Sequence, residues 1–397
     1  MNCTGIIAEW NPFHLGHCHL LEAARHGGAT HIVAVMSGNY VQRGEAALCP
    51  KRYRVSAALQ CGCDLVLELP LPYAAATAER FAFGGVALLE ALGCVDTLLF
   101  GSEVGEIESL QEACAALESP AFRDALAGEL RDGSPFAAAR QRAAAALCGE
   151  KAAAVLSSPN NILAVEYLMA LRRMHSTIRP ATIARVGAGH DSGLDREGYA
   201  SASLLRQRFR AGESIADFLP DVMNAQLLAA QREGALFDPT LFERPLMAAL
   251  RRMSEQEYAV LPDLSEGLEH RLYRESRTAP NAAALLDAVK TKRYSHARLR
   301  RILLAAFLGI PADLCRLSPP YLRVLGMNER GAEILAAAKG RAALPVSVSL
   351  AELARTGEDA RRFVEVEARA TDLYNTMTPI LRPCDEEYTL PFVKIGG

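Results

Sequence analysis

Two histidines near the N-terminus, His14 and His17, have the residue type and spacing to act on a phosphate group. They stand three residues apart, where a short apolar segment over 4–8 gives way to helical spacing from Gly16 onward. Ligands of parallel α/β sheets bind at the carboxyl ends of the strands, where the next helix offers free backbone N–H groups to an anion. Gly16 would let a phosphate approach that backbone closely. The pattern predicts a site for phosphoryl oxygens that gain charge in a transition state, with two ordinary turn histidines as the alternative.

A second group of polar residues, Ser201, Ser203 and Arg206, stands at the start of another segment with helical spacing. Hydroxyl groups and an arginine at the beginning of a helix can hold phosphate oxygens. The alternative is a pair of capping serines beside a solvated arginine. The sequence contains neither G-K-[ST] nor G-x-G-x-x-G, which excludes a Walker A loop and the dinucleotide-binding fingerprint.

The elements that must position these residues alternate in type over the first half of the chain. Short apolar segments predict strands over 4–8, 31–36, 64–69, 95–100 and 181–186. Helical spacing and its end signals predict helices over 16–25, 50–60, 77–92, 105–150, 159–174 and 201–210. Strands that alternate with helices of this length favour βαβ units, a parallel sheet and right-handed crossovers.

The strand pattern fades after about residue 210, and the remaining residues are mostly helical in spacing. We therefore expect an α/β protein whose N-terminal domain, 1–210, is a Rossmann-like parallel sheet that activates the substrates. The second domain, 211–397, is expected to be mainly α-helical and to bind RNA. The segment from Val35 to Glu45 is expected to be a loop that contacts a ligand or closes over it, with an ordinary solvated loop as the alternative.

Composition excludes several classes of protein. The 397 residues carry 43 Lys and Arg against 46 Asp and Glu, a net charge of -3, which excludes a uniformly basic nucleic-acid coat. A hydrophobic fraction of 50% with 22% charged residues is typical of a folded protein. The longest apolar run, 302–310, is shorter than the about 20 residues that a membrane span needs. Ten cysteines without C-x-x-C spacing favour reduced thiols in a cytoplasmic protein and predict no metal site.

One stretch of the second half could bind RNA. Between 290 and 301 the sequence has six basic residues and no acidic one, namely Lys290, Lys292, Arg293, Arg298, Arg300 and Arg301. Phosphate contacts dominate nucleic-acid affinity, and the intervening Tyr294 and His296 could stack on unpaired bases. The alternative is a solvated helix face. A second basic group, Arg43, Lys51, Arg52 and Arg54, could guide an RNA loop or a nucleotide toward the predicted site.

Longer segments resemble the tRNA(Met) cytidine acetate ligase family, which belongs to the H-x-G-H nucleotidyltransferase superfamily. They are E-W-N-P-F-H-L-G-H, V-M-S-G-N-Y-V-Q-R-G-E, D-L-V-L-E-L-P, L-F-G-S-E, S-P-N-N-I-L-A-V-E-Y, K-T-K-R-Y and R-V-L-G. The segment around Ser203 also resembles the superfamily's I-S-x-T-x-I-R motif, with Ser203 in place of Thr and Ala200 in place of Ile. Trp10 stands where Tyr is common in the family, and Leu15 stands where Asn is common.

The resemblance implies an H-x-G-H nucleotidyltransferase fold and a two-step ligase reaction. Acetate would attack the α-phosphate of ATP to give acetyl-adenylate and pyrophosphate. The acetyl group would then move to N4 of the wobble cytidine of elongator tRNA(Met), forming N4-acetylcytidine. The substrates would be ATP, acetate and elongator tRNA(Met), with Mg²⁺ on the ATP phosphates, no tightly bound protein-ligated metal and no obligatory protein partner.

The resemblance also implies roles for individual residues. His14, His17 and Arg206 would be catalytic. Those three would bind ATP together with Ile7, Asn11, Pro12, Phe13, Gly16, Leu20, Gly101, Asn160, Asn161, Arg185, Ser201 and Ser203. Which of Asn160 and Asn161 contacts ATP stays open, as does any role of Gly101 beyond that of a turn glycine. The charge of 290–301, and not the resemblance, makes its six basic residues the predicted contacts of the tRNA.

The chemistry of acetate agrees with a site of this kind. Acetate, with a pKa of roughly 4.3, is already ionised at pH 7 and needs no general base. The site must instead offset repulsion between two anions with cations and N–H donors. The motifs alone leave two alternatives open: an adenylyltransferase that acts on a phosphorylated small molecule, and a non-catalytic nucleotide-dependent RNA-binding protein.

Overall fold

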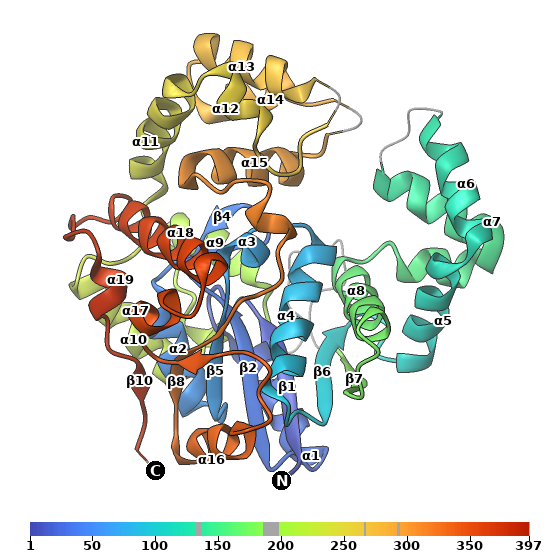
Figure 1. Ribbon diagram of the computed structural model, residues 1–397, viewed down its shortest axis with the longest axis vertical. Coiled ribbons are helices and arrows are strands. Elements are labelled where there is room, and N and C mark those ends of the chain that lie inside the picture. Colours follow the sequence, from blue (N-terminus) through green and yellow to red (C-terminus); the bar gives the residue numbers. More distant parts are fainter. Residues whose placement is uncertain (132–135, 186–197, 266, 292–293, 397) are drawn as a thin grey trace.

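A mostly parallel sheet forms the centre of the molecule (Figure 1). The computed structural model describes residues 1–396 except 132–135, 186–197, 266 and 292–293. Within these residues the sheet has eight strands, seven of them in the order β10-β8-β5-β2-β1-β6-β7, with β9 beside β8. They are β1 (Cys3–Ala8), β2 (His31–Ser37), β5 (Leu65–Leu69), β6 (Thr97–Ser102), β7 (Arg179–Ala184), β8 (Leu322–Met327), β9 (Val346–Ser347) and β10 (Val393–Lys394).

The two faces of the sheet belong to two different hydrophobic clusters. Side chains alternate along β2, so that Val33 and Val35 pack in one cluster while Ile32 and Ala34 pack in the other. Helices α4 (Ala78–Leu92) and α8 (Pro159–Arg173) cover the first face, and α1 (Leu15–His26) and α2 (Lys51–Gln60) cover the second. Because both faces are covered, β2 is buried along its whole length, as its continuous apolar sequence predicts.

The remaining helices form two extensions and a C-terminal layer (Figure 1). Beside α8 lie α5 (Ile107–Glu118), α6 (Pro120–Arg131) and α7 (Phe136–Val155). The upper extension contains α11 (Pro239–Arg252), α12 (Glu255–Ala259), α13 (Leu268–Thr278), α14 (Ala282–Val289) and α15 (His296–Leu308). The others are α3 (Leu71–Ala74), α9 (Ala202–Arg210), α10 (Asp221–Arg232), α16 (Glu329–Ala338), α17 (Leu350–Ala354), α18 (Glu358–Asn375) and α19 (Glu386–Thr389).

The α/β fold and the alternation of strands and helices in the first 210 residues are confirmed. Most predicted bounds lie within a few residues of the observed ones; the helix expected over 77–92, for example, is α4, Ala78–Leu92. Its end is marked by Gly93, whose φ of 72° lies in the left-handed region that glycine adopts without strain. The helical segment expected over 105–150 is instead divided into α5, α6 and α7.

The prediction that Val35 to Glu45 is a loop is wrong for part of this segment. Strand β2 continues to Ser37, and β3 (Tyr40–Val41) then pairs antiparallel with β4 (Glu45–Ala46) to form a hairpin. Distant residues support this hairpin, since the Tyr40 hydroxyl donates to the carbonyl oxygen of Ala370 at 3.1 Å. Such a contact leaves no local signal in the sequence.

The expectation that the sheet ends near residue 210 is also wrong. Strand β8 pairs antiparallel with β5, and β9 and β10 both pair with β8. Within β8 the buried Arg323 interrupts the apolar pattern, because its guanidinium pairs with Glu68 of β5 at 2.7 Å. Residues after 210 thus complete the same sheet, and a division into 1–210 and 211–397 stays a prediction about folding units.

Candidate functional site

The junction between β1 and α1 brings two imidazole rings together. His14 is the N-cap of α1, and its Nδ1 accepts a hydrogen bond from the Gly16 backbone N–H at 3.1 Å. The backbone N–H of His14 in turn donates to Nδ1 of His17 at 3.1 Å. The rings are stacked, with centroids 3.7 Å apart and planes 26° apart. Because each Nδ1 accepts a hydrogen bond, a neutral ring carries its proton on Nε2, and both Nε2–H groups stay available as donors.

Burial sets the charge of this histidine pair. Burial, together with the nearby Arg185, lowers the pKa of His14 to about 3. Burial, His14 and Arg185 together also lower the pKa of His17 well below its ordinary value. Both rings are therefore neutral at pH 7, so they supply N–H donors while the positive charge of the site comes from arginines.

Arg206 approaches the same junction from helix α9. Its Nη1 donates to the backbone carbonyl oxygen of Asn11 at 2.8 Å, and its Nη2 lies 3.4 Å from Oε2 of Glu45. The Nε of Arg206 and the Nδ2 of Asn11 are both buried without a hydrogen-bond partner in the protein. Unmade hydrogen bonds of buried donors are costly, so these two groups favour a ligand that supplies acceptor oxygens.

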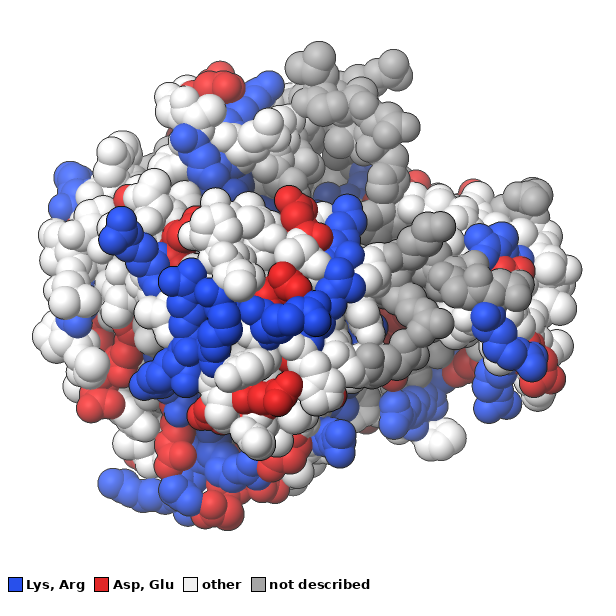
Figure 2. Space-filling view, turned by 90° about the horizontal axis from the view of Figure 1, so that it is seen from above, with Lys and Arg blue, Asp and Glu red and all other residues white. Residues whose placement is uncertain are grey.

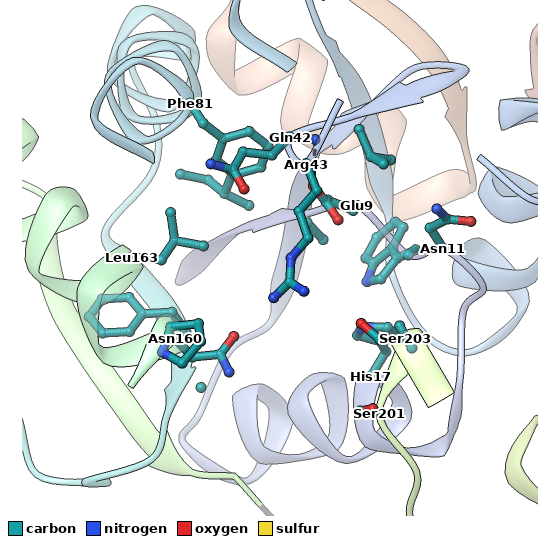
Figure 3. Close-up of a pocket in the computed structure, with 18 of the residues that line it drawn as sticks. Glu9, Asn11, His17, Gln42, Arg43, Phe81, Asn160, Leu163, Ser201 and Ser203 are labelled. Atoms are coloured by element: carbon teal, nitrogen blue, oxygen red, sulfur yellow. Dashed lines mark hydrogen bonds between the residues drawn. The ribbon is translucent and has the colours of Figure 1, made fainter. Parts of the chain in front are cut away.

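Ser201 and Ser203 have different positions at the start of α9. The Ser201 hydroxyl caps the helix by accepting from the backbone N–H of Leu204 at 3.2 Å, as the capping alternative predicts. Both serines also line a cavity of about 290 Å³ at the carboxyl ends of the strands (Figure 3). Capping and contact with a ligand are therefore compatible for Ser201.

Most of the predicted ATP-binding residues lie around this cavity. Those that line it are Ile7, Asn11, His14, His17, Leu20, Gly101, Asn160, Arg185, Ser201, Ser203 and Arg206. Three others are placed elsewhere: Pro12 is buried, Phe13 packs edge-on against Trp10 in the core, and Gly16 lines an adjoining recess. Pro12 and Phe13 therefore pack beneath the β1–α1 junction and do not line the cavity.

The structure separates the two neighbouring asparagines of α8. Asn160 lines the cavity, and its Nδ2 donates to Oε1 of Glu103 at 2.6 Å. Asn161 is buried, and its Oδ1 accepts from the backbone N–H groups of Glu103 and Val104 at 2.8 and 3.1 Å. Asn160 is thus the one placed to meet a ligand, while Asn161 holds the loop that follows β6.

Gly101 lies at the end of β6 beside Arg185. A Cβ atom added to Gly101 would come within 3.1 Å of Cγ of Arg185. The absence of a side chain at Gly101 therefore leaves room for Arg185 next to the strand, and burial lowers the pKa of the Arg185 guanidinium. A direct contact of Gly101 with adenosine stays a prediction.

The predicted set of ATP-binding residues left out several residues that line the cavity. Glu9 follows β1 directly and precedes the histidine motif, so its position in the motif was a usable signal. Gln42 and Arg43 come from the β3–β4 hairpin, in the segment expected to contact a ligand. Phe81 of α4 and Leu163 of α8 gave no signal, because apolar residues at helical spacing usually indicate a core face.

The basic residues of 290–301 are less free than the sequence indicates. Lys290 is exposed, whereas Lys292 and Arg293 lie outside the described residues. Asp263 pairs with this segment, since its backbone carbonyl oxygen accepts from Nη2 of Arg298 at 2.7 Å and its Oδ2 lies 3.1 Å from Nη2 of Arg301. An acidic residue distant in sequence thus offsets part of the charge.

The second basic group does not form an open surface. Lys51 and Arg54 are buried, and Arg54 donates to backbone carbonyl oxygens such as that of Glu9 at 2.6 Å. Arg52 pairs with Glu233 at 2.5 Å, which leaves Arg43 as the exposed member that lines the cavity. The interpretation of these four residues as one guiding surface is therefore wrong.

In the part of the chain that the structure describes, no helix is long and apolar enough to cross a membrane. The same residues include no group of three or more His, Cys, Asp and Glu arranged to hold a metal ion.

Comparisons with known proteins extend the likeness over the whole chain. A family model described as HIGH Nucleotidyl Transferase matches residues 1–387. The tRNA(Met) cytidine acetate ligase of Syntrophotalea carbinolica is 40% identical over 400 residues, covering 96% of this chain and 95% of that protein. The protein of the same name from Caldanaerobacter subterraneus subsp. tengcongensis is 38% identical over 406 residues, covering 100% of both. A crystal structure of Thermotoga maritima TmcAL bound with alpha-thio ATP matches with a TM-score of 0.92 and 30% identity, covering 100% of both chains.

Proposed function

The chain belongs to the tRNA(Met) cytidine acetate ligase family of HIGH nucleotidyl transferases, and from this premise we propose its reaction. It is an ATP-dependent ligase that joins acetate to N4 of a cytidine in tRNA(Met), through acetyl-adenylate. The acceptor is the wobble cytidine of elongator tRNA(Met), and the product is N4-acetylcytidine. Because tRNA is the acceptor, the proposal includes a cytoplasmic location.

The observation that carries this proposal is the set of unused N–H donors at the β1–α1 junction. Nε2–H of His14 and of His17 are joined there by the buried Nε of Arg206 and the Nδ2 of Asn11. All four residues line one cavity at the N-terminus of α1. Donors held in place before the reaction can stabilise charge that develops on phosphoryl oxygens.

In the first step, a carboxylate oxygen of acetate attacks the α-phosphorus of ATP and pyrophosphate leaves. The neutral histidine pair can donate to oxygens of the α-phosphate without moving a proton, since acetate is already ionised. Arg206 and the serines before it would hold the phosphates that leave, and Asn160 and Arg185, which line the same cavity, would hold the nucleoside. Mg²⁺ would be held by ATP phosphates and water and would neutralise part of their charge.

In the second step, N4 of cytidine attacks the acetyl carbon and AMP leaves. The wobble base must leave its stack to reach the cavity, as bases do in other enzymes that modify them. The turn of the β3–β4 hairpin lies against the middle of α15, because a Cβ atom on Gly44 would come within 2.6 Å of the Arg301 backbone N. The basic residues of α15 and the cavity are therefore neighbouring parts of one surface.

The tRNA surface is proposed on the upper face of the molecule, over the helices α11–α15. Figure 2 looks onto this face and shows Lys and Arg gathered there with Asp and Glu between them. Replacing Lys290 or Arg300 by Gln is expected to weaken tRNA binding and to lower its salt slope by about one unit each. A slope that stays unchanged in both variants would move the tRNA site elsewhere.

Acetate-dependent exchange between ATP and pyrophosphate tests the activation step. The purified protein is expected to catalyse exchange only with acetate, and His14→Ala and His17→Ala are each expected to lower it by about 10²–10³-fold. His26→Ala, an exposed histidine at the end of the same helix, is the matched control. Exchange without acetate but with a phosphorylated metabolite would favour the adenylyltransferase alternative, and ATP binding without either activity would favour the RNA-binding protein.

A further inference from the structure

Glu9 is a carboxylate in a cavity otherwise built for anions. Among the described residues that line the cavity it is the one acidic side chain, whereas Arg43, Arg185 and Arg206 contribute positive charge. A carboxylate at this place weakens the attraction for ATP and acetate. A role toward a group that donates hydrogen bonds is a better explanation of its presence.

The surrounding structure holds Glu9 in one position. Its Oε1 accepts from the backbone N–H of Gln42 in the hairpin at 2.8 Å. Its backbone carbonyl oxygen accepts from Nη1 of Arg54 at 2.6 Å, and Arg54 is completely buried. Oε2 has no hydrogen-bond partner among the residues that the structure describes, so this oxygen stays available to a ligand.

Glu9 lies on a different side of the cavity from His17 and Ser203, which belong to the proposed phosphate site. In Figure 3, Arg43 projects between Glu9 and the wall formed by His17 and Ser203. Gln42 and Phe81 lie together on the other side of Glu9, and Leu163 continues the apolar wall there. A flat base with apolar faces and polar edges matches such a wall.

We infer that Oε2 of Glu9 accepts a hydrogen bond from the N4 amino group of the target cytidine and takes its proton during acetyl transfer. This inference rests on the proposed function. Carboxylates are the side chains that accept from N4 of cytosine, so the same group both recognises the base and acts on it. In the step, the bond between N4 and the acetyl carbon forms, and the bond between that carbon and the AMP oxygen breaks. AMP keeps the electron pair, and the N4 proton passes to Glu9 and then to water.

The charges that face Glu9 suit this role. Burial raises the pKa of the Glu9 carboxyl above its ordinary value, while the Gln42 N–H and the cations Arg206, Arg43 and Arg54 act in the opposite direction. Tyr167 of α8 also faces it, and burial keeps that phenol protonated by raising its pKa. A carboxylate with a raised pKa holds an incoming proton better, which favours general base catalysis.

The test compares the two half-reactions in Glu9→Gln, which keeps the shape and the Oε1 acceptor. Transfer from chemically prepared acetyl-adenylate to tRNA(Met) is expected to fall by about 10²-fold or more, far more than acetate-dependent exchange falls. The wild-type transfer rate is expected to decline at acid pH as Glu9 takes a proton, and the low rate of the variant is expected to be independent of pH. Glu9→Asp should restore part of the transfer, and Glu22→Gln, an exposed residue of α1, is the matched control.

Three outcomes would contradict the inference: an unchanged transfer rate, equal losses in the two half-reactions, or an acid decline that persists in Glu9→Gln. Equal losses would mean that Glu9 supports ATP binding or the fold instead. Failure of the proposed function is distinguishable, because the wild-type protein itself would then show neither acetate-dependent exchange nor transfer to tRNA(Met).

Discussion

The molecule concentrates charged groups in two regions and treats them in opposite ways. Around the cavity, the Arg206 Nε and the Asn11 Nδ2 are buried without partners. Behind the hairpin lies a second region, here called the buried ion network, in which opposite charges face each other. Its members are Lys51, Glu68, Arg323, Glu367 and Glu387.

The contacts of the buried ion network are short and cross several elements. Nζ of Lys51 lies 2.5 Å from both Glu68 and Glu387, and Nη1 of Arg323 lies 2.7 Å from Glu68. These residues belong to α2, β5, β8 and α19, so the network ties the C-terminal segment to the sheet. In the buried ion network the carboxylates and cations pair with each other, although the Nε of Arg323 has no partner there either. Around the cavity, Arg206 and Asn11 keep unpaired donors on residues that line a space large enough for a ligand.

The largest expected effect concerns the buried ion network. Arg323→Met keeps an apolar stem but leaves Glu68 and Glu387 without part of their counter-charge, and we expect a loss of about 3–5 kcal/mol in unfolding free energy. Denaturant unfolding measures it. Arg361→Met removes an exposed ion pair on α18 and should change stability little, so equal effects of the two substitutions would contradict the comparison.

Substitutions of residues that line the cavity should lower activity and leave stability nearly unchanged. His17→Ala removes one pre-placed donor, and we expect acetate-dependent exchange to fall about 10²–10³-fold, which corresponds to about 2.7–4 kcal/mol. The thermal unfolding midpoint should stay near that of the wild-type protein. A large loss of stability would show that the stacked pair holds the fold as the buried ion network does.

The stability of the protein should depend on pH in different ranges through two carboxylates of the buried ion network, Glu367 and Glu387. Burial and the neighbouring Glu68 raise the pKa of Glu367 from 4.5 to about 8. Its contribution to stability is thus fully present below about pH 4.5 and is lost as the pH rises toward 8, by at most about 1.4 kcal/mol per pH unit. Glu367→Gln stays neutral and should lack this decline.

The free energy of unfolding of the wild-type protein and of Glu367→Gln, measured between about pH 5 and 8, tests this prediction. Glu387 does not titrate in this range. Burial alone would raise the pKa of Glu387, but Lys51 and Arg323 outweigh it and hold this pKa at about 2. The stability that Glu387 contributes is lost only below about pH 4.5, as the pH falls toward 2, so it does not interfere. Parallel pH profiles of the wild-type protein and Glu367→Gln would contradict the prediction.

The smallest expected effect concerns two neighbouring residues of α8. Asn160 lines the cavity, and Asn161 is buried and hydrogen-bonded within the chain. Asn160→Ala removes a side chain from the cavity wall, and we expect ATP binding to weaken by about 0.5–1.5 kcal/mol without a comparable loss of stability. Asn161→Ala leaves the N–H groups of Glu103 and Val104 unpaired and should lower stability first. Calorimetric titration with ATP and thermal unfolding measure the two effects in both variants. A loss of stability in Asn160→Ala together with a loss of ATP affinity in Asn161→Ala would contradict the assignment.

The local parts of the site could be predicted from the sequence. Strand β1, the turn and the start of α1 are adjacent in the chain, so the spacing of His14 and His17 already places both rings at one helix N-terminus. The same holds for Ser201 and Arg206 at the start of α9. Resemblance to a family then supplied acetate and tRNA(Met), which the chemistry of these residues does not specify.

Only the tertiary structure decided which distant residues complete the site and the fold. The pairing of β8 with β5, the support of the hairpin by α18, and the contact of Asp263 with Arg298 join segments far apart in sequence. Periodicity records which face of an element is apolar, but it does not record what lies next to that face. It therefore could not show that Phe81 and Leu163, which belong to the core, also line the cavity. A buried charge such as Arg323 likewise interrupts the apolar pattern of a strand. The strand is not recognised until the partner Glu68 is known, because a buried charge without a partner is costly.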